Sequence, residues 1–234
     1  MFAACISMNL VFIIDATAAS FQAQIKAFIN DILLGTNNVY SNAKQNLLGV
    51  NSRIQVALVS MGDGARSLEN FLSFDYLTKG ASVNSMNIIQ AGSADVTSPV
   101  QLIKGFLDSQ AQLFGSRAVD PNVFVYITYR TPQSQGLQAA LEQYNIPDTR
   151  VICVGVETPE TVVDQISSVN GWGMMVQNFN ELQSFATYTQ NLICDAALPG
   201  EEEERGYSIS ILTHSILFLA YFAEATSSLP ILFV

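Results

Sequence analysis

Histidine and charge are what this 234-residue sequence has least of. It contains one histidine, His214, and charged residues make up 13% of the sequence, about half the share of an average soluble domain. A single histidine excludes Ser-His-Asp triads and zinc sites built from several histidines. Acidic residues outnumber basic ones 20 to 10, whereas a surface that binds nucleic acid needs the opposite balance. We therefore expect no nucleic-acid partner.

Cysteine is also scarce, with three residues in the whole sequence. Cys153 lies inside the apolar run VICVG and is interpreted as a small core residue. Cys5 and Cys194 stand near the two ends of the ordered-looking region. From the residues alone they are either a bridge that joins the domain ends or two unrelated thiols.

The hydrophobic content of 49% is high enough to bury a large core and excludes disorder of the bulk. The C-terminal part differs in composition from the rest. Residues 196–206 form an acidic linker, and residues 207–234 form a hydrophobic tail. Three interpretations of the tail stay open: a lipid-anchor signal, a marginal membrane span, or an irregular extension without function. Membrane contact is expected only through this tail, and no signal peptide is visible at the N-terminus.

Apolar runs alternate with segments of helical period between the two ends. Strands are expected at residues 9–14, 53–60, 67–74, 122–128, 150–155 and 174–177. Helices are expected at residues 18–34, 97–114, 132–144, 159–169 and 180–193. This alternation predicts an α/β fold over residues 5–195: a single doubly wound, mostly parallel sheet, with helices on both faces and one antiparallel edge strand.

Ligands of such sheets bind beyond the carboxyl ends of strands where the strand order reverses. Asp15 follows the first strand directly, and Thr17 comes two residues later. The pair suits either a helix cap or hard oxygen ligands for a divalent cation. The first strand-helix turn lacks Gly-x-Gly-x-x-Gly, and no phosphate-binding P-loop occurs in the sequence. We therefore expect no enzyme; a small-molecule-binding α/β enzyme is the alternative.

Residues 9–17, NLVFIIDAT, resemble the opening of a von Willebrand factor type A (vWA) domain, whose first strand leads into Asp-x-Ser-x-Ser. The resemblance spans residues 5–195. It continues through RIQVALVS (53–60), TSPVQL (97–102), VFVYIT (123–128), VICVGV (151–156), NFNEL (178–182) and LIC (192–194). It implies the Rossmann-like vWA fold and a cell-adhesion or protein-binding module, secreted or at the cell surface. The implied partner is a protein of the extracellular matrix or a receptor. It also implies a disulfide between Cys5 and Cys194.

The same resemblance implies a metal-ion-dependent adhesion site, in which carboxylate and hydroxyl oxygens hold Mg²⁺ and a ligand carboxylate completes the coordination. Asp15 matches the first acid, Thr17 can replace the first serine, and Thr97 matches the threonine of a later loop. Ala19 stands where the second serine belongs, and Tyr129 stands where the second acid belongs. The site is therefore expected to be degenerate.

Arg130 adds a positive charge beside the expected cation position. Because Mg²⁺ requires near-octahedral oxygen coordination, we expect no metal cofactor and a metal-independent interaction module. The alternative is a Mg-dependent adhesion domain that binds ligand carboxylates.

Overall fold

Strands and helices alternate along the sequence in the computed structural model, which describes residues 8–34, 54–61, 66–71, 83–84, 97–114, 121–130, 137–146, 149–167 and 172–197. The strands are β1 (Met8–Asp15), β2 (Ile54–Met61), β3 (Arg66–Phe71), β4 (Asn122–Tyr129), β5 (Thr149–Val156) and β6 (Trp172–Val176). The α-helices are α1 (Gln22–Leu34), α4 (Thr97–Phe114), α5 (Leu137–Gln143), α6 (Glu160–Ser167), α7 (Phe179–Leu182) and α8 (Ala186–Ala196). Two 3₁₀ helices, η1 (Ala16–Phe21) and η2 (Gln183–Phe185), precede α1 and α8. Cys5, most of the acidic linker and the hydrophobic tail lie outside the described residues.

The described strands form one sheet in the order β3-β2-β1-β4-β5-β6. β1 runs parallel to both β2 and β4, and β4, β5 and β6 are parallel to one another. β3 pairs antiparallel with β2 at one edge. The chain moves outward from β1 to β2 and β3, then returns to β4 on the other side of β1. The predicted doubly wound α/β sheet is confirmed, and its order reverses between β1 and β4.

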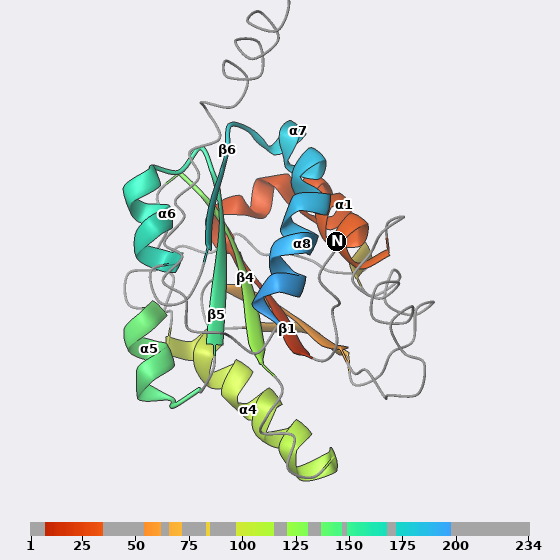
Figure 1. Ribbon diagram of the computed structural model, residues 1–234, viewed down its shortest axis with the longest axis vertical. Helices are drawn as coiled ribbons and strands as arrows, with labels where there is room; N and C mark the ends of the chain where they lie inside the picture. Colours follow the sequence, from red (N-terminus) through yellow and green to blue (C-terminus); the bar gives the residue numbers. More distant parts are fainter. Residues whose placement is uncertain are drawn as a thin grey trace, which may run out of the picture.

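Helices cover both faces of this sheet (Figure 1). Successive side chains of a strand point to opposite faces, so the apolar run of β1 serves two cores. Leu10, Phe12 and Ile14 pack in a cluster with residues of α1, α7 and α8. Val11 and Ile13 pack in a second cluster with residues of α4, α5 and α6. A strand buried on both faces needs the continuous hydrophobic run that β1 has.

Several helices differ from the expected ranges. The helix expected from residue 18 begins as η1, and the one expected at 180–193 is divided into α7, η2 and α8. The described part of the helix expected at 132–144 is α5, while residues 131–136 lie outside the description. The last strand starts at Trp172, because Trp172 pairs with Ile152 of β5.

Among the described helices, none is long and apolar enough to cross a membrane.

Candidate functional site

Three neighbouring strands end at the same edge of the sheet. β1 ends at Asp15, β4 at Tyr129 and β5 at Val156, and all three run in the same direction. The strand order reverses between β1 and β4, which is where ligands of open α/β sheets bind. The residues that follow these strands therefore form the candidate site.

Asp15 is buried at this edge, and both of its carboxylate oxygens accept hydrogen bonds. Oδ1 accepts from the backbone N–H and the hydroxyl of Thr17, each at 2.9 Å. Oδ2 accepts from the phenol of Tyr126 at 3.0 Å and the hydroxyl of Thr128 at 3.3 Å. The bond from the Thr17 N–H makes Asp15 the N-cap of η1, as expected of an acid that precedes a helix.

Of the other two predicted metal ligands, Thr17 contacts Asp15, and the position of Thr97 is known from its backbone. Thr97 is the first residue of α4, whose buried residues Val100 and Ile103 pack on the sheet face that Tyr126 also occupies; its side chain lies outside the description. Ala19 is buried in the opposite cluster, with α1 and α8. A metal site would need an oxygen where Ala19 presents a methyl group.

Tyr129 fills the position of the second acid with an aromatic ring. Its ring packs edge-on against Phe21 with 5.1 Å between centroids, and lies 5.4 Å from the ring of Phe179. Phe21 and Phe179 are stacked at 4.0 Å. We call Phe21, Tyr129 and Phe179 the aromatic cluster. It joins the ends of η1 and β4 to the start of α7 beside the candidate site.

The described residues of this edge do not complete a coordination shell for a divalent cation. Mg²⁺ requires about six oxygen ligands in near-octahedral geometry, whereas the described edge offers the Asp15 carboxylate with its oxygens already hydrogen-bonded. No group of three or more His, Cys, Asp or Glu residues that could hold a metal occurs among the described residues.

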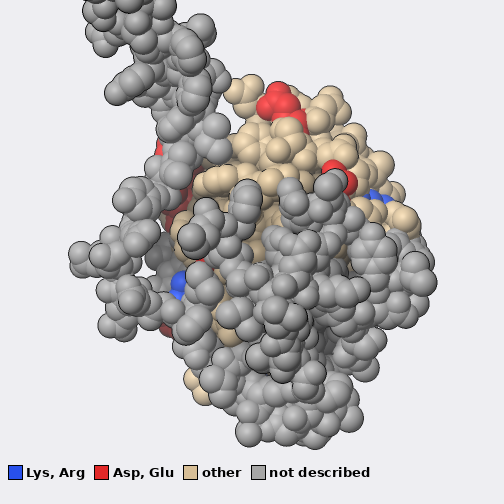
Figure 2. All heavy atoms as spheres, turned by 45° about the vertical axis from the view of Figure 1, so that its right-hand side comes forward, with Lys and Arg blue, Asp and Glu red and all other residues tan. Residues whose placement is uncertain are grey.

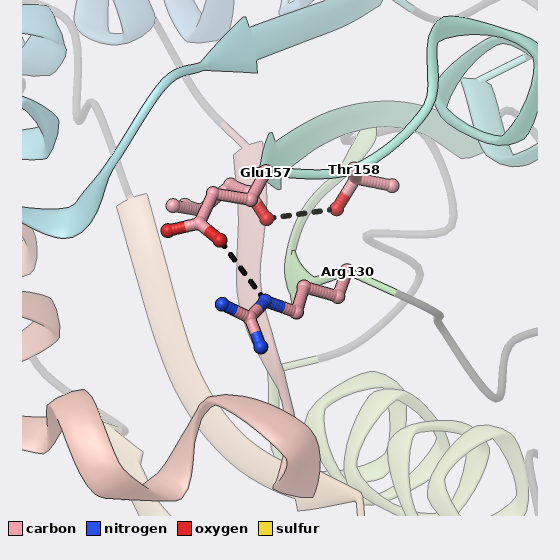
Figure 3. A network of polar contacts seen from close by, with 4 residues as sticks. Arg130, Glu157 and Thr158 are labelled. Atoms are coloured by element: carbon pink, nitrogen blue, oxygen red, sulfur yellow. Dashed lines mark hydrogen bonds and ion pairs between the residues drawn. The ribbon is translucent and has the colours of Figure 1, made fainter.

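An ion pair joins the loops that follow β4 and β5. The guanidinium Nε of Arg130 donates to Oε2 of Glu157 at 2.9 Å (Figure 3). This hydrogen bond raises the pKa of Arg130, and the charge of Tyr129 adds to the effect. The Arg130 Cζ atom also lies 4.7 Å from the centroid of the Tyr129 ring, within range of a cation–π contact.

Sequence reasoning missed the hydroxyl donors of Tyr126 and Thr128 and the partner of Arg130. Tyr126 was expected only as part of a buried strand. The register that sets Ile13 opposite Tyr126 brings its phenol to Asp15, and one sequence does not reveal this register. The only signal is a phenol in a buried run, since a buried tyrosine needs a hydrogen-bond partner.

Cys153 and Cys194 are both buried. Cys153 is a free thiol in the middle of β5, as expected for a core residue, and burial raises its pKa. A thiol that is buried and protonated is a poor nucleophile. The predicted pairing of Cys194 with Cys5 involves a residue outside the description.

The sheet order, the helices on both faces and the edge site define a Rossmann-like α/β domain of the vWA fold. No protein-family model matches the sequence, and no curated protein is significantly similar to it.

The fold is similar to those of several solved structures. The protein is similar to proximal thread matrix protein 1 (PTMP1) from the mussel byssus, with a TM-score of 0.62 and 14% identity. It is also similar to PTMP1 with a zinc-occupied MIDAS motif (metal-ion-dependent adhesion site), with a TM-score of 0.64 and 12% identity. Each comparison covers 83% of this chain and 50% of the PTMP1 chain. A vWA protein from Catenulispora acidiphila matches with a TM-score of 0.54 and 12% identity, over 79% of this chain and 42% of the other. This chain thus spans about half the length of the structures it matches, and at these identities the likeness concerns the fold.

Proposed function

We propose that this chain is a vWA-type adhesion module that binds a protein partner without a divalent metal. The observation that carries the proposal is the bonding of Asp15. At the position where a vWA domain coordinates Mg²⁺, hydroxyl groups of Thr17, Tyr126 and Thr128 donate to the carboxylate. These internal donors satisfy the acid, so the edge can remain folded without a cation.

The absence of catalysis is part of the same proposal. The described edge has no histidine, and the one free thiol among the described residues is buried in β5. A nucleophile needs an adjacent base or a lowered pKa, and Cys153 has a raised one. Figure 2 shows a face whose described surface is mostly uncharged, with separate acidic and basic groups. Such a surface suits a protein partner better than a phosphate backbone.

We further propose an extracellular or cell-surface location and a partner from the extracellular matrix or a receptor. PTMP1, one of the structural neighbours, comes from the mussel byssus. In an oxidising compartment Cys5 and Cys194 would form a disulfide. The free thiol of Cys153 is buried in β5, which leaves Cys5 and Cys194 as the two cysteines available for this pairing.

The test is binding of the full-length protein to immobilised matrix proteins and receptor ectodomains by surface plasmon resonance. Each is measured in millimolar Mg²⁺ and again in excess EDTA. We expect at least one saturable interaction whose affinity is the same in both buffers. Binding that disappears in EDTA would contradict metal independence, and no saturable binding to any member of the panel would contradict the interaction module.

A Mg-dependent adhesion domain is the second candidate. It is favoured by the retained contact between Asp15 and Thr17 and by the zinc-occupied motif of PTMP1. The comparison of Mg²⁺ with EDTA distinguishes the two candidates directly.

A further inference from the structure

Arg130 has an unusual backbone conformation at the candidate site. Its φ is 56°, in the left-handed region, and that of its ion-pair partner Glu157 is 49°. Backbone hydrogen bonds hold both: the Arg130 N–H donates to the carbonyl of Val156 at 3.0 Å, and the Glu157 N–H donates to the carbonyl of Val176 at 2.9 Å. Glycine adopts this conformation without steric cost, whereas a residue with a Cβ does not. Strained positions of this kind gather at binding sites.

The side chain of Arg130 is fixed but still exposed. The Glu157 carboxylate holds its Nε, and the Tyr129 ring supports one side of the guanidinium. The aromatic cluster in turn holds Tyr129 in place. The Arg130 side chain nevertheless keeps 64% of its surface exposed. Its two outer nitrogens have no hydrogen-bond partner among the described residues, and one of them points away from Glu157 in Figure 3. The guanidinium is therefore oriented before any partner arrives.

We propose that the Arg130 guanidinium binds one carboxylate of the partner protein and thereby takes the place of a metal ion at this edge. The inference rests on the proposed function, because it names the ligand chemistry of the same interaction surface. The two outer nitrogens of a guanidinium present parallel N–H donors that match the two oxygens of a carboxylate.

A single carboxylate fits this site better than a more highly charged anion. Glu157 already balances the charge of Arg130 at 2.9 Å. A doubly charged group such as phosphate loses more hydration energy on binding than a carboxylate does, and the balanced pair offers no surplus positive charge to compensate that loss. The Tyr129 ring beside the guanidinium offers apolar surface to the methylene group that carries a carboxylate. An aspartate or glutamate residue and the carboxyl terminus of a polypeptide share this chemistry.

The experiment is an NMR titration of the isotope-labelled full-length protein, which follows the Nε–Hε signal of Arg130 and the amides of Glu157 and Thr158. Three probes are used: N-acetyl-aspartic acid α-amide, whose side-chain carboxylate is free, for an acidic residue, N-acetyl-alanine for a carboxyl terminus, and inorganic phosphate. We expect saturable shifts with one or both carboxylates and weaker binding of phosphate. The carboxylate probe that binds more tightly shows whether the partner supplies an acidic side chain or a carboxyl terminus. Phosphate binding as tightly as both carboxylates would overturn the assignment.

Substitutions at position 130 separate binding from folding. Arg130→Gly removes the guanidinium and relieves the backbone strain, so it should fold and yet bind the carboxylate probes at least about tenfold more weakly. Arg130→Lys keeps the charge but loses the paired donors, and should weaken binding roughly threefold or more. The matched control is Arg150→Gln, because Arg150 lies at the opposite end of β5; it should bind like the unchanged protein. Equal binding by Arg130→Gly and the unchanged protein would overturn the proposal.

The proposed function can fail or survive independently of this inference. If Arg130→Gly still binds an immobilised protein partner in EDTA with unchanged affinity, the interaction module stands and the carboxylate site is wrong. If the partner is lost together with the carboxylate shifts, both are supported.

Discussion

Asp15 is held at the carboxyl edge of the sheet by hydrogen bonds from several neighbouring groups. Its carboxylate is fully buried, and a buried charge is costly unless hydrogen bonds or an ion compensate it. Thr17, Tyr126 and Thr128 provide that compensation with neutral donors. The residue therefore works as a cap and as a link between β1 and β4.

The Tyr126 phenol should contribute measurably to stability. Tyr126→Phe removes its hydrogen bond to Asp15 and should lower the free energy of unfolding by about 1 kcal/mol. Asp15→Asn replaces one acceptor oxygen by an amide NH₂ group that faces other donors. It should lower the free energy of unfolding by about 1–3 kcal/mol. Urea denaturation measures both. The control is Tyr144→Phe, because Tyr144 is a partly buried tyrosine that packs against the same cluster as Tyr126. If Tyr126→Phe costs no more than Tyr144→Phe, the link is unimportant.

Asp195, near the end of α8, makes stability depend on pH. Partial burial raises its pKa above the ordinary value of 3.8, so the folded state favours the protonated carboxyl. The contribution of Asp195 to folding stability is fully present below the ordinary pKa. It is lost as the pH rises through the higher pKa of the folded state. Asp195→Asn should therefore have a higher Tm than the unchanged protein at neutral pH, and the difference should shrink toward about pH 3. A difference that grows on acidification would contradict this account.

At the scale of elements, α6 packs unusually closely on β5 and β6. A Cβ on Gly155 would lie 2.5 Å from Cγ2 of Val163, and one on Gly173 would lie 2.6 Å from Cγ1 of the same valine. Real side chains do not approach so closely, so helix and sheet would have to separate. Glycine at these two strand positions sets the distance between the layers.

Gly155→Ala should therefore destabilise the protein by about 1–3 kcal/mol. The matched control is Gly105→Ala in α4, where a Cβ meets nothing within 4 Å; it should stabilise by about 0.5–1 kcal/mol because alanine favours helix. Thermal and urea unfolding measure both changes. The double variant Gly155→Ala/Val163→Ala should lose less stability than the sum of the two single losses, because Val163→Ala relieves the clash. Equal effects of the two glycine substitutions would contradict the packing argument.

Elements were easier to predict than the contacts between them. Buried strands such as β1 and β4 are visible as apolar runs, and α4 is visible from its helical period, because burial on a face imposes that pattern. The Asp15 cap is also visible, since it depends on residues two positions apart. The Tyr126–Asp15 bond and the Arg130–Glu157 pair are not. They join residues 111 and 27 positions apart, and strand register decides them.

At the scale of the whole molecule, our proposal places a metal-independent site on a scaffold of the vWA fold. Fold alone does not fix function. The proposal rests instead on the residues at the carboxyl edge, where internal hydrogen bonds engage Asp15 and Arg130 would take the place of a cation. The predicted disulfide between Cys5 and Cys194 belongs to this scale as well.

The predicted Cys5–Cys194 bridge can be measured by counting thiols in the full-length protein. Alkylation after denaturation without reductant should modify Cys153 alone, and reduction first should allow all three cysteines to react. Intact-mass spectrometry reports the number of added groups. Native protein is the control, because buried Cys153 should react slowly. Three modified cysteines without reductant would contradict the bridge and the oxidising compartment.

Metal titration of the purified full-length protein tests the central claim most directly. Calorimetry and thermal unfolding are carried out with Mg²⁺ and Mn²⁺ up to millimolar concentration, on the unchanged protein and on Asp15→Ala. The Asp15 oxygens are engaged by internal donors, Ala19 offers no hydroxyl, and Tyr129 offers no carboxylate. We therefore predict no saturable heat and no shift in Tm with either metal. A saturable heat or Tm shift that Asp15→Ala abolishes would contradict the account.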